Sequence, residues 1–135
     1  MRKVTRAVTQ YFDRFLEPAG VRATQFTLLV ALFSTKGKTL TEIAEDLVMD
    51  RTTLTRNLKP LEKMGLIATV QTLDKRSKAY MLTEKGEQTV DRCIPMWQQA
   101  QNSVVNSLGD ETYKDIVGKL SRMLTITSNN KERKK

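Results

Sequence analysis

The chain has 135 residues and a formal net charge of +8, from 23 Lys and Arg against 15 Asp and Glu. A surface this basic favours polyanions such as nucleic acid or acidic lipid, although charge also serves solubility alone. With no histidine and one cysteine, Cys93, a single chain cannot form a His/Cys zinc site, a Ser–His or Cys–His pair or a disulfide, so we expect no metal, no cofactor and no enzyme activity.

The first part of the chain predicts two helices. Apolar residues recur at helical spacing over about residues 3–17, and Pro18 and Gly20 end this amphipathic segment. A second helix is predicted over 26–33, where apolar residues on most sides indicate a central position.

Two short helices joined by a three-residue break are predicted next. Thr39 and Glu42 have the spacing of a capping box, so a helix over 40–47 is expected to begin there. After a break at 48–50, a second short helix is predicted over 51–64. Two short helices connected in this way are the arrangement of a helix-turn-helix.

The second of these helices has one apolar and one basic side. Asp50 is a favourable N-cap for it, and Gly65 is a typical residue just past a helix end. At 100° per residue, Leu54, Leu58 and Leu61 lie within about 60° of one another and define the buried stripe.

Hydroxyls and long cations occupy the side opposite that stripe. They are Thr52, Arg56, Lys59 and Lys63, with Thr53 and Thr55 on the flanks. Such a face suits the major groove of DNA, where arginine binds guanine and threonine meets a base edge or a thymine methyl. Because the N-terminal residues of a recognition helix reach deepest, base contacts are predicted for Thr52, Thr53, Thr55 and Arg56, and phosphate contacts for Lys59 and Lys63. The alternative is an ordinary solvated helix face.

A basic hairpin follows this helix. Strands are predicted over 67–73 and 78–82, with a polar tip at 74–77. Residues 51–82 carry seven basic and two acidic side chains, a net +5. That concentration of charge indicates that the basic side chains have a purpose beyond solubility.

The hairpin tip is predicted to contact nucleic acid. Lys75, Arg76 and Lys78 would reach the DNA backbone or the minor groove, where an arginine senses groove shape. Asp74 would be repelled by phosphate, so its expected role is to hold Arg51 or Arg76 in place. The alternative is a hairpin tip that is polar for solubility alone.

The C-terminal part of the chain predicts a long helix and a shorter one. Thr83 is expected to cap the long helix, whose apolar residues follow a heptad-like 4, 3, 4, 3 spacing until Gly109. The last helix begins at Asp110, and the tail over 128–135 is expected to be basic and disordered. No signal-type or membrane-spanning segment is visible. A chain that can form no internal disulfide suits a reducing cytoplasm, where we expect the protein.

Five ordered segments carry a family resemblance. They are LTEIAEDL (40–47), DRTTLTR (50–56), LEKMGLI (61–67), DKR (74–76) and LTEKG (82–86). In this order and with these gaps, the chain resembles the MarR family of winged helix-turn-helix regulators. The resemblance implies a mainly α (α+β) winged helix-turn-helix fold in one domain over 1–127. Its DNA-binding lobe would cover about 24–82, and helices over about 3–17 and 83–127 would form a dimerisation lobe.

The resemblance also implies a function. It is a homodimeric, sequence-specific transcriptional regulator that binds a pseudo-palindromic double-stranded operator, acting as a repressor relieved by a small aromatic or lipophilic effector. By position, Arg51, Thr52, Thr53, Thr55 and Arg56 match the recognition helix, and Asp74 and Arg76 match the wing pair. Tyr11, Phe15, Phe26 and Trp97 could line an effector cleft, or serve simply as core residues.

One residue departs from the family pattern. Val48 stands where the family often has glycine in the turn between the two short helices. Because a β-branched residue resists positive φ, we expect this turn to follow another backbone path.

Other functions remain open at this point. A non-specific architectural DNA-binding protein would also use the positive charge. A protein-interaction module would be expected to carry acidic or apolar residues on the second short helix, and this sequence shows the reverse. Cys93 is expected to be structural, since a redox sensor needs exposure and a low pKa.

Overall fold

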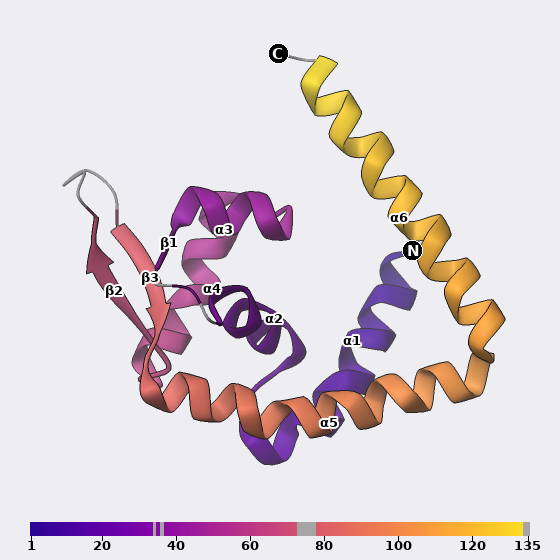
Figure 1. Cartoon of the computed structure of the whole chain (residues 1–135), viewed down its shortest axis with the longest axis horizontal. Coiled ribbons are helices and arrows are strands. Elements are labelled where there is room, and N and C mark those ends of the chain that lie inside the picture. The colour runs from indigo at the N-terminus through magenta and orange to yellow at the C-terminus, as the bar shows by residue number, and fades with distance from the viewer. Residues whose placement is uncertain (34, 36, 73–77, 134–135) are drawn as a thin grey trace. The chain divides into compact units, whose positions relative to one another are not determined.

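The computed structural model describes residues 1–33, 35, 37–72 and 78–133, with side chains through residue 127. Its elements are α1 (Arg2–Leu16), the 3-10 turn η1 (Glu17–Ala19), α2 (Ala23–Leu32), β1 (Lys38–Thr39), α3 (Leu40–Leu47), α4 (Arg51–Lys63), β2 (Ile67–Gln71), β3 (Lys78–Leu82), α5 (Glu84–Leu108) and α6 (Asp110–Arg133) (Figure 1). They group into two compact units, Met1–Gln98 and a second that begins at Gln99. The single domain and lobe boundaries predicted from the sequence stay predictions.

The core of the first unit is built from aliphatic side chains, mainly leucines, of several helices. Leu16 of α1, Leu29 of α2, Ile43 of α3 and Leu54 and Leu61 of α4 are all 0% exposed. Each residue lies on the apolar side of an amphipathic helix or, in α2, of a helix apolar on most sides. Removing these side chains from water is the main force that holds the helices together.

A hydrogen bond across the first turn positions α2 against α1. The Asp13 carboxylate of α1 accepts from the backbone N–H of Ala23, the first residue of α2, at 2.7 Å. The N-terminal N–H groups of a helix have no partner within it, so a carboxylate from a neighbouring helix satisfies one of them. Gly20, with φ of 77°, reverses the chain between the two helices.

Three strands form a small antiparallel sheet in the order β1-β3-β2. The predicted hairpin is confirmed, with Ile67 opposite Leu82 and Gln71 opposite Lys78 (Figure 1). The first strand ends at Gln71, before the predicted limit of 73. β1 was not predicted, because a strand of two residues gives no periodic signal in the sequence.

A set of close contacts joins the start of α5 to the end of α4. The Thr83 hydroxyl donates to the carbonyl of Gly65 at 2.6 Å and accepts from the N–H of Gly86 at 3.0 Å, which confirms Thr83 as a cap. A Cβ at Gly86 would lie 2.0 Å from the Leu66 carbonyl oxygen, so only glycine permits this approach. The Lys85 ammonium also donates to the carbonyl of Met64 at 2.8 Å. The base of the hairpin is thereby held against the C-terminal end of α4.

The last helix is longer than expected from the sequence. α6 runs from Asp110 to Arg133, so the expected disorder over 128–135 is wrong for the helical residues 128–133. Beyond Gly118 this segment contains no glycine or proline to end a helix, and local backbone hydrogen bonding can continue through polar residues. Leu108 and Asp110 flank Gly109, which has φ of 85° and separates α5 from α6 as predicted.

The turn between α3 and α4 corrects the expectation for Val48. This residue adopts the left-handed conformation, with φ of 52° and ψ of 51°, and does not take another path. The N–H of Val48 donates to the Glu45 carbonyl at 3.3 Å, and that of Met49 donates to the Ala44 carbonyl at 2.9 Å. These two bonds form a Schellman motif, which normally places glycine at this position. The motif and the packing of both helices outweigh the local strain of a valine, about 1–2 kcal/mol.

Val48→Gly is expected to stabilise the protein. The valine side chain is 61% exposed, so its removal loses little burial. Relief of the strain exceeds the extra backbone entropy that glycine loses on folding, about 0.5–1 kcal/mol. We expect Tm to rise by about 2–3 °C in a thermal unfolding experiment. Val48→Ala retains a Cβ and should fall between wild type and Val48→Gly; a glycine variant less stable than the alanine variant would contradict the strain argument.

Candidate functional site

The N-terminal end of α4 is organised by one carboxylate. Asp50 accepts from the Thr53 N–H at 2.8 Å through Oδ1 and from the Thr53 hydroxyl at 2.7 Å through Oδ2. The backbone bond, and next the hydroxyl bond, lower the pKa of the Asp50 carboxyl below its ordinary value, and the Arg56 guanidinium adds to this effect. Asp50 is therefore the predicted N-cap, and it is ionised at neutral pH.

The two sides of α4 have opposite chemistry, as predicted. Leu54, Leu58 and Leu61 are at most 1% exposed and form the buried stripe. Thr52, Thr55, Arg56 and Lys59 line a shallow depression of about 350 Å³ on the other side. Thr52, Arg56 and Lys59 are exposed, whereas Thr55 is half-buried.

Two of the threonine hydroxyls bond to the protein itself. Thr53 donates to the Asp50 carboxylate, and Thr55 donates to the backbone carbonyl of Arg51 at 2.8 Å. Thr53 and Thr55 are both half-buried, while Thr52 is exposed. Thr52, Thr53 and Thr55, which were predicted together as base contacts, therefore share a surface but differ in the hydrogen bonds that they can still donate.

The cations of this helix are available to a partner. Arg51, Arg56, Lys59 and Lys63 are all exposed. The ion pairs found between described residues are Lys38–Asp46 and Lys119–Asp115, and neither lies on α4. The acid closest to the Lys63 end is Glu62, which lies off the basic side. A surface with exposed positive charge and hydroxyls can bind a polyanion.

The hairpin contributes one described cation. Lys78, the first residue of β3, is exposed and pairs in register with Gln71. The other predicted wing residues, Asp74, Lys75 and Arg76, lie outside the described residues. Their assignment as wing contacts and wing support stays a prediction.

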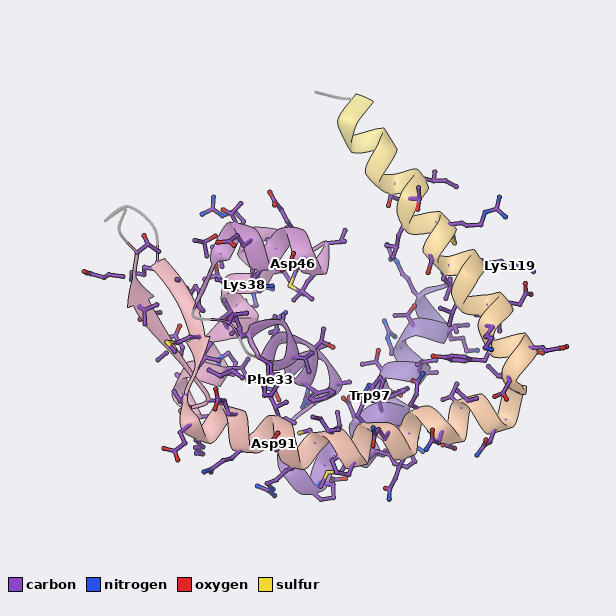
Figure 2. The ribbon with its side chains drawn as sticks, viewed as in Figure 1. Phe33, Lys38, Asp46, Asp91, Trp97 and Lys119 are labelled. Atoms are coloured by element: carbon purple, nitrogen blue, oxygen red, sulfur yellow. The ribbon has the colours of Figure 1, made fainter. Side chains whose placement is uncertain are left out.

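A separate cleft lies on the first unit, away from the basic side of α4. It has a volume of about 410 Å³ and is lined by Phe26, Thr27, Val30, Ala31, Lys38, Asp46, Leu47 and Trp97. The Lys38 ammonium and the Asp46 carboxylate form an ion pair of 2.6 Å at this cleft, with Trp97 on α5 (Figure 2). No sequence pattern predicts this pair, because its partners come from β1 and α3 and meet only in the folded chain.

The aromatic residues proposed for an effector cleft divide into two groups. Phe26 and Trp97 line the cleft, and their ring centroids are 6.5 Å apart. Tyr11 and Phe15 are not among the lining residues and pack edge-to-face on each other at 5.2 Å. Trp97 is 37% exposed, so part of its indole ring is accessible to solvent.

The structure supports neither redox nor metal chemistry among the residues that it describes. Cys93 is fully buried, and burial raises the pKa of its thiol, so it has the properties of a core residue. Across the described part of the chain, no group of three or more acidic or cysteine side chains could hold a metal ion. None of the helices there is long and apolar enough to cross a membrane.

Known proteins provide an independent comparison. The sequence model of the MarR family matches residues 21–78. The structure of the M. tuberculosis transcriptional regulator MosR in complex with DNA is 31% identical, with a TM-score of 0.79 and 93% of each chain covered. The S. aureus MepR–DNA complex is 25% identical, with a TM-score of 0.81 and coverage of 92% of this chain and 93% of that one.

Sequence relatives agree with the structural comparison. An uncharacterised HTH-type transcriptional regulator of Bacillus anthracis is 28% identical over 130 residues, covering 96% of this chain and 87% of the relative. The HTH-type transcriptional regulator Hpr of Geobacillus sp. (strain WCH70) is 26% identical over 122 residues. That match covers 90% of this chain but spans only 60% of the Hpr regulator.

Proposed function

The chain belongs to the MarR family of winged helix-turn-helix transcriptional regulators, and we propose that it binds double-stranded DNA sequence-specifically. The observation that carries this proposal is the exposed side of α4, where Thr52, Arg56 and Lys59 face solvent and form no ion pair with a described acidic side chain. The DNA-bound structure of MosR, which shares 31% identity, supports it.

The geometry of α4 suits the major groove. The Arg56 guanidinium can bind guanine O6 and N7 with two hydrogen bonds, and Thr52 lies one helical turn before it. Lys59 and Lys63 follow along the helix and can neutralise phosphates. Because Asp50 holds the N-terminal end of α4 in place, these side chains extend from a rigid element.

The hairpin is proposed to contact the adjacent DNA. Lys75, Arg76 and Lys78 would bind the backbone or the minor groove, and Asp74 would hold Arg51 or Arg76 in place. Arg51 itself is the first residue of α4 and belongs to the recognition helix. The contacts of Thr83, Lys85 and Gly86 hold the hairpin base against α4, so helix and hairpin can approach DNA together. A protein-interaction module is disfavoured because the exposed side of α4 lacks large apolar groups.

We also propose that the chain is a homodimer that binds a pseudo-palindromic operator. α6 exposes a series of apolar side chains that a monomer would leave in water. They are Ile116, Val117, Leu120, Met123, Leu124 and Ile126, each 39–61% exposed. In the first unit, Val4 and Val8 of α1 are 65% and 47% exposed. Exposed apolar series of this kind are typical of surfaces that bind another protein.

The protein is further proposed to act as a repressor that releases DNA when a small-molecule effector binds. The cleft beside Trp97 supports this proposal, because it combines apolar walls with the Lys38–Asp46 ion pair and has the size of a small-ligand site. An aromatic carboxylic acid fits this chemistry, with its ring against Phe26 and Trp97 and its carboxylate near the Lys38 ammonium.

Arg56→Ala and Arg76→Ala are expected to weaken DNA binding in different ways. With the duplex that the protein selects from a random pool, Arg56→Ala should lose about 10- to 100-fold in affinity and relax the preference at one base pair. Arg76→Ala should weaken binding to all duplexes and reduce the slope of log K against log salt by about 1.

Lys119→Ala, which removes a charge from α6, is the control. If neither variant alters affinity for the selected duplex, α4 and the hairpin are not the DNA surface; equal affinity of the wild type for selected and random duplexes would favour architectural binding.

Leu120→Glu is expected to convert the dimer to a monomer and to abolish operator binding. A carboxylate at this position would have to be buried unpaired in the interface. Size-exclusion chromatography with light scattering measures the mass. Thr125→Glu adds the same charge to α6 about 140° around the helix from Leu120, so it should remain dimeric. A monomeric wild-type protein at micromolar concentration would contradict the proposal.

Benzoate and its larger aromatic analogues are expected to bind the cleft and release DNA. Trp97 is the single tryptophan of the chain, so its fluorescence reports on this cleft alone. Binding should change the fluorescence and weaken operator affinity over the same concentration range. Ala31→Phe would fill the cleft and should remove both effects while leaving DNA binding intact. If no compound alters either signal, this cleft is not an effector site of that class.

A further inference from the structure

The three threonines at the start of α4 differ in whether the hydroxyl hydrogen is already donated to an acceptor within the protein. The Thr53 hydroxyl lies 2.7 Å from the Asp50 carboxylate, and the Thr55 hydroxyl lies 2.8 Å from the Arg51 carbonyl. A carboxylate and a backbone carbonyl have no hydrogen to donate, so the threonine is the donor in both bonds. Each of these hydroxyls has therefore used its single hydrogen inside the protein.

The ionisation state of Asp50 makes the first of these assignments secure. Its two oxygens accept from the Thr53 N–H and the Thr53 hydroxyl, and both bonds lower the pKa of the carboxyl. At neutral pH the group is a carboxylate, which accepts hydrogen bonds only. The hydroxyl of Thr53 cannot reverse its direction without losing a charge-assisted bond.

Thr52 is the exception among the three. Its side chain is exposed, and its hydroxyl has no hydrogen-bond partner among the described residues. It retains one donor and two acceptor sites for a partner. Arg56, exposed one turn later on the same side, offers only donors.

From this difference we propose that Thr52 and Arg56 are the hydrogen-bond donors to base edges. This assignment rests on the proposed DNA-binding function. Thr53 and Thr55 face DNA without a donor, presenting a methyl group and acceptor lone pairs. These four residues at the start of α4 thus divide into two donors that recognise base acceptors and two threonines that recognise a methyl or an amino group.

This division restricts the bases that each side chain can recognise. In the major groove, guanine offers only acceptors, and thymine offers one acceptor and a methyl group. Cytosine offers an amino donor, and adenine offers an amino donor and an acceptor. Thr52 and Arg56 therefore match base acceptors, which are O6 and N7 of guanine, O4 of thymine and N7 of adenine; of the four bases, only guanine gives Arg56 two acceptors. Thr53 and Thr55 match the thymine methyl or the amino group of cytosine or adenine, and do not match guanine.

Threonine-to-valine substitution tests the proposal, because valine keeps the shape and methyl group but lacks the hydroxyl. Duplexes are selected from a random pool with the full-length wild type, Thr52→Val and Thr55→Val, and affinities are measured on the wild-type winner. Thr52→Val should lose at least about fivefold in affinity, the equivalent of one hydrogen bond, together with a preference for a base acceptor. Thr55→Val should stay within twofold, or lose preference only for cytosine or adenine.

The opposite results would overturn the proposal. Unchanged binding by Thr52→Val, or loss of preference for guanine or thymine by Thr55→Val, would show that the donors are assigned wrongly. If the lost base is adenine, 7-deaza-adenine decides the case, since it lacks the N7 acceptor: unchanged wild-type affinity supports the proposal, and a loss overturns it.

These experiments distinguish failure of sequence-specific DNA binding from failure of the donor assignment. If the wild type enriches no sequence, the proposed sequence-specific function fails, and the assignment of donors fails with it. If the wild type enriches a sequence but the valine variants behave in the opposite way, only the assignment of donors fails. Matching Tm values for wild type and variants show that folding is unaffected, and a valine variant that does not fold is replaced by alanine at the same position, Thr52→Ala or Thr55→Ala.

Discussion

The rotational position of α4 is the constraint on which the site depends. Successive residues of a helix are 100° apart, so the buried leucines determine which side chains face solvent. Leu54 and Leu61, both 0% exposed, hold one side of α4 against the core, and the Asp50 carboxylate holds its first turn through Thr53. With the phase and the start of the helix both set, Thr52 and Arg56 must point outward. Hydrophobic burial and one charged cap together present the polar surface that the proposed function requires.

Two tight connections hold α4 in its surroundings. On one side, Val48 accepts a left-handed backbone so that a Schellman motif can end α3 directly before α4. On the other side, Gly86 lets the start of α5 approach the Leu66 carbonyl, and Thr83 bonds to Gly65. The first connection tolerates strain at an exposed residue, while the second avoids it by using glycine. Both connections are short, so α4, which is proposed to bind the major groove, is joined closely to α3 and α5.

The cleft beside Trp97 and the basic side of α4 are built from connected elements. Asp46 and Leu47 of α3 line the cleft, and Val48 and Met49 then lead directly into α4. The ion pair between Lys38 and Asp46 links β1, and through it the sheet, to the same helix. A change in the cleft would therefore act on α3, which is joined to α4 by the short turn. This connection gives a physical route for an effector to influence DNA binding, if the cleft is occupied as proposed.

Elements whose signals are local could be predicted from the residues alone. The capping box of Thr39 and Glu42, the N-cap Asp50, the hairpin strands and the two sides of α4 are all found as predicted, since each depends on residues within about two helical turns. Three features could be seen only in the folded chain: the conformation of Val48, the two-residue strand β1 and the pairing of Lys38 with Asp46. The hydroxyl bonds of Thr53 and Thr55 are local, to residues three and four positions earlier, but they depend on side-chain rotamers that a linear pattern does not specify. For Val48, β1 and the Lys38–Asp46 pair, contacts made by packing outweighed, or added to, what the neighbouring residues alone would favour.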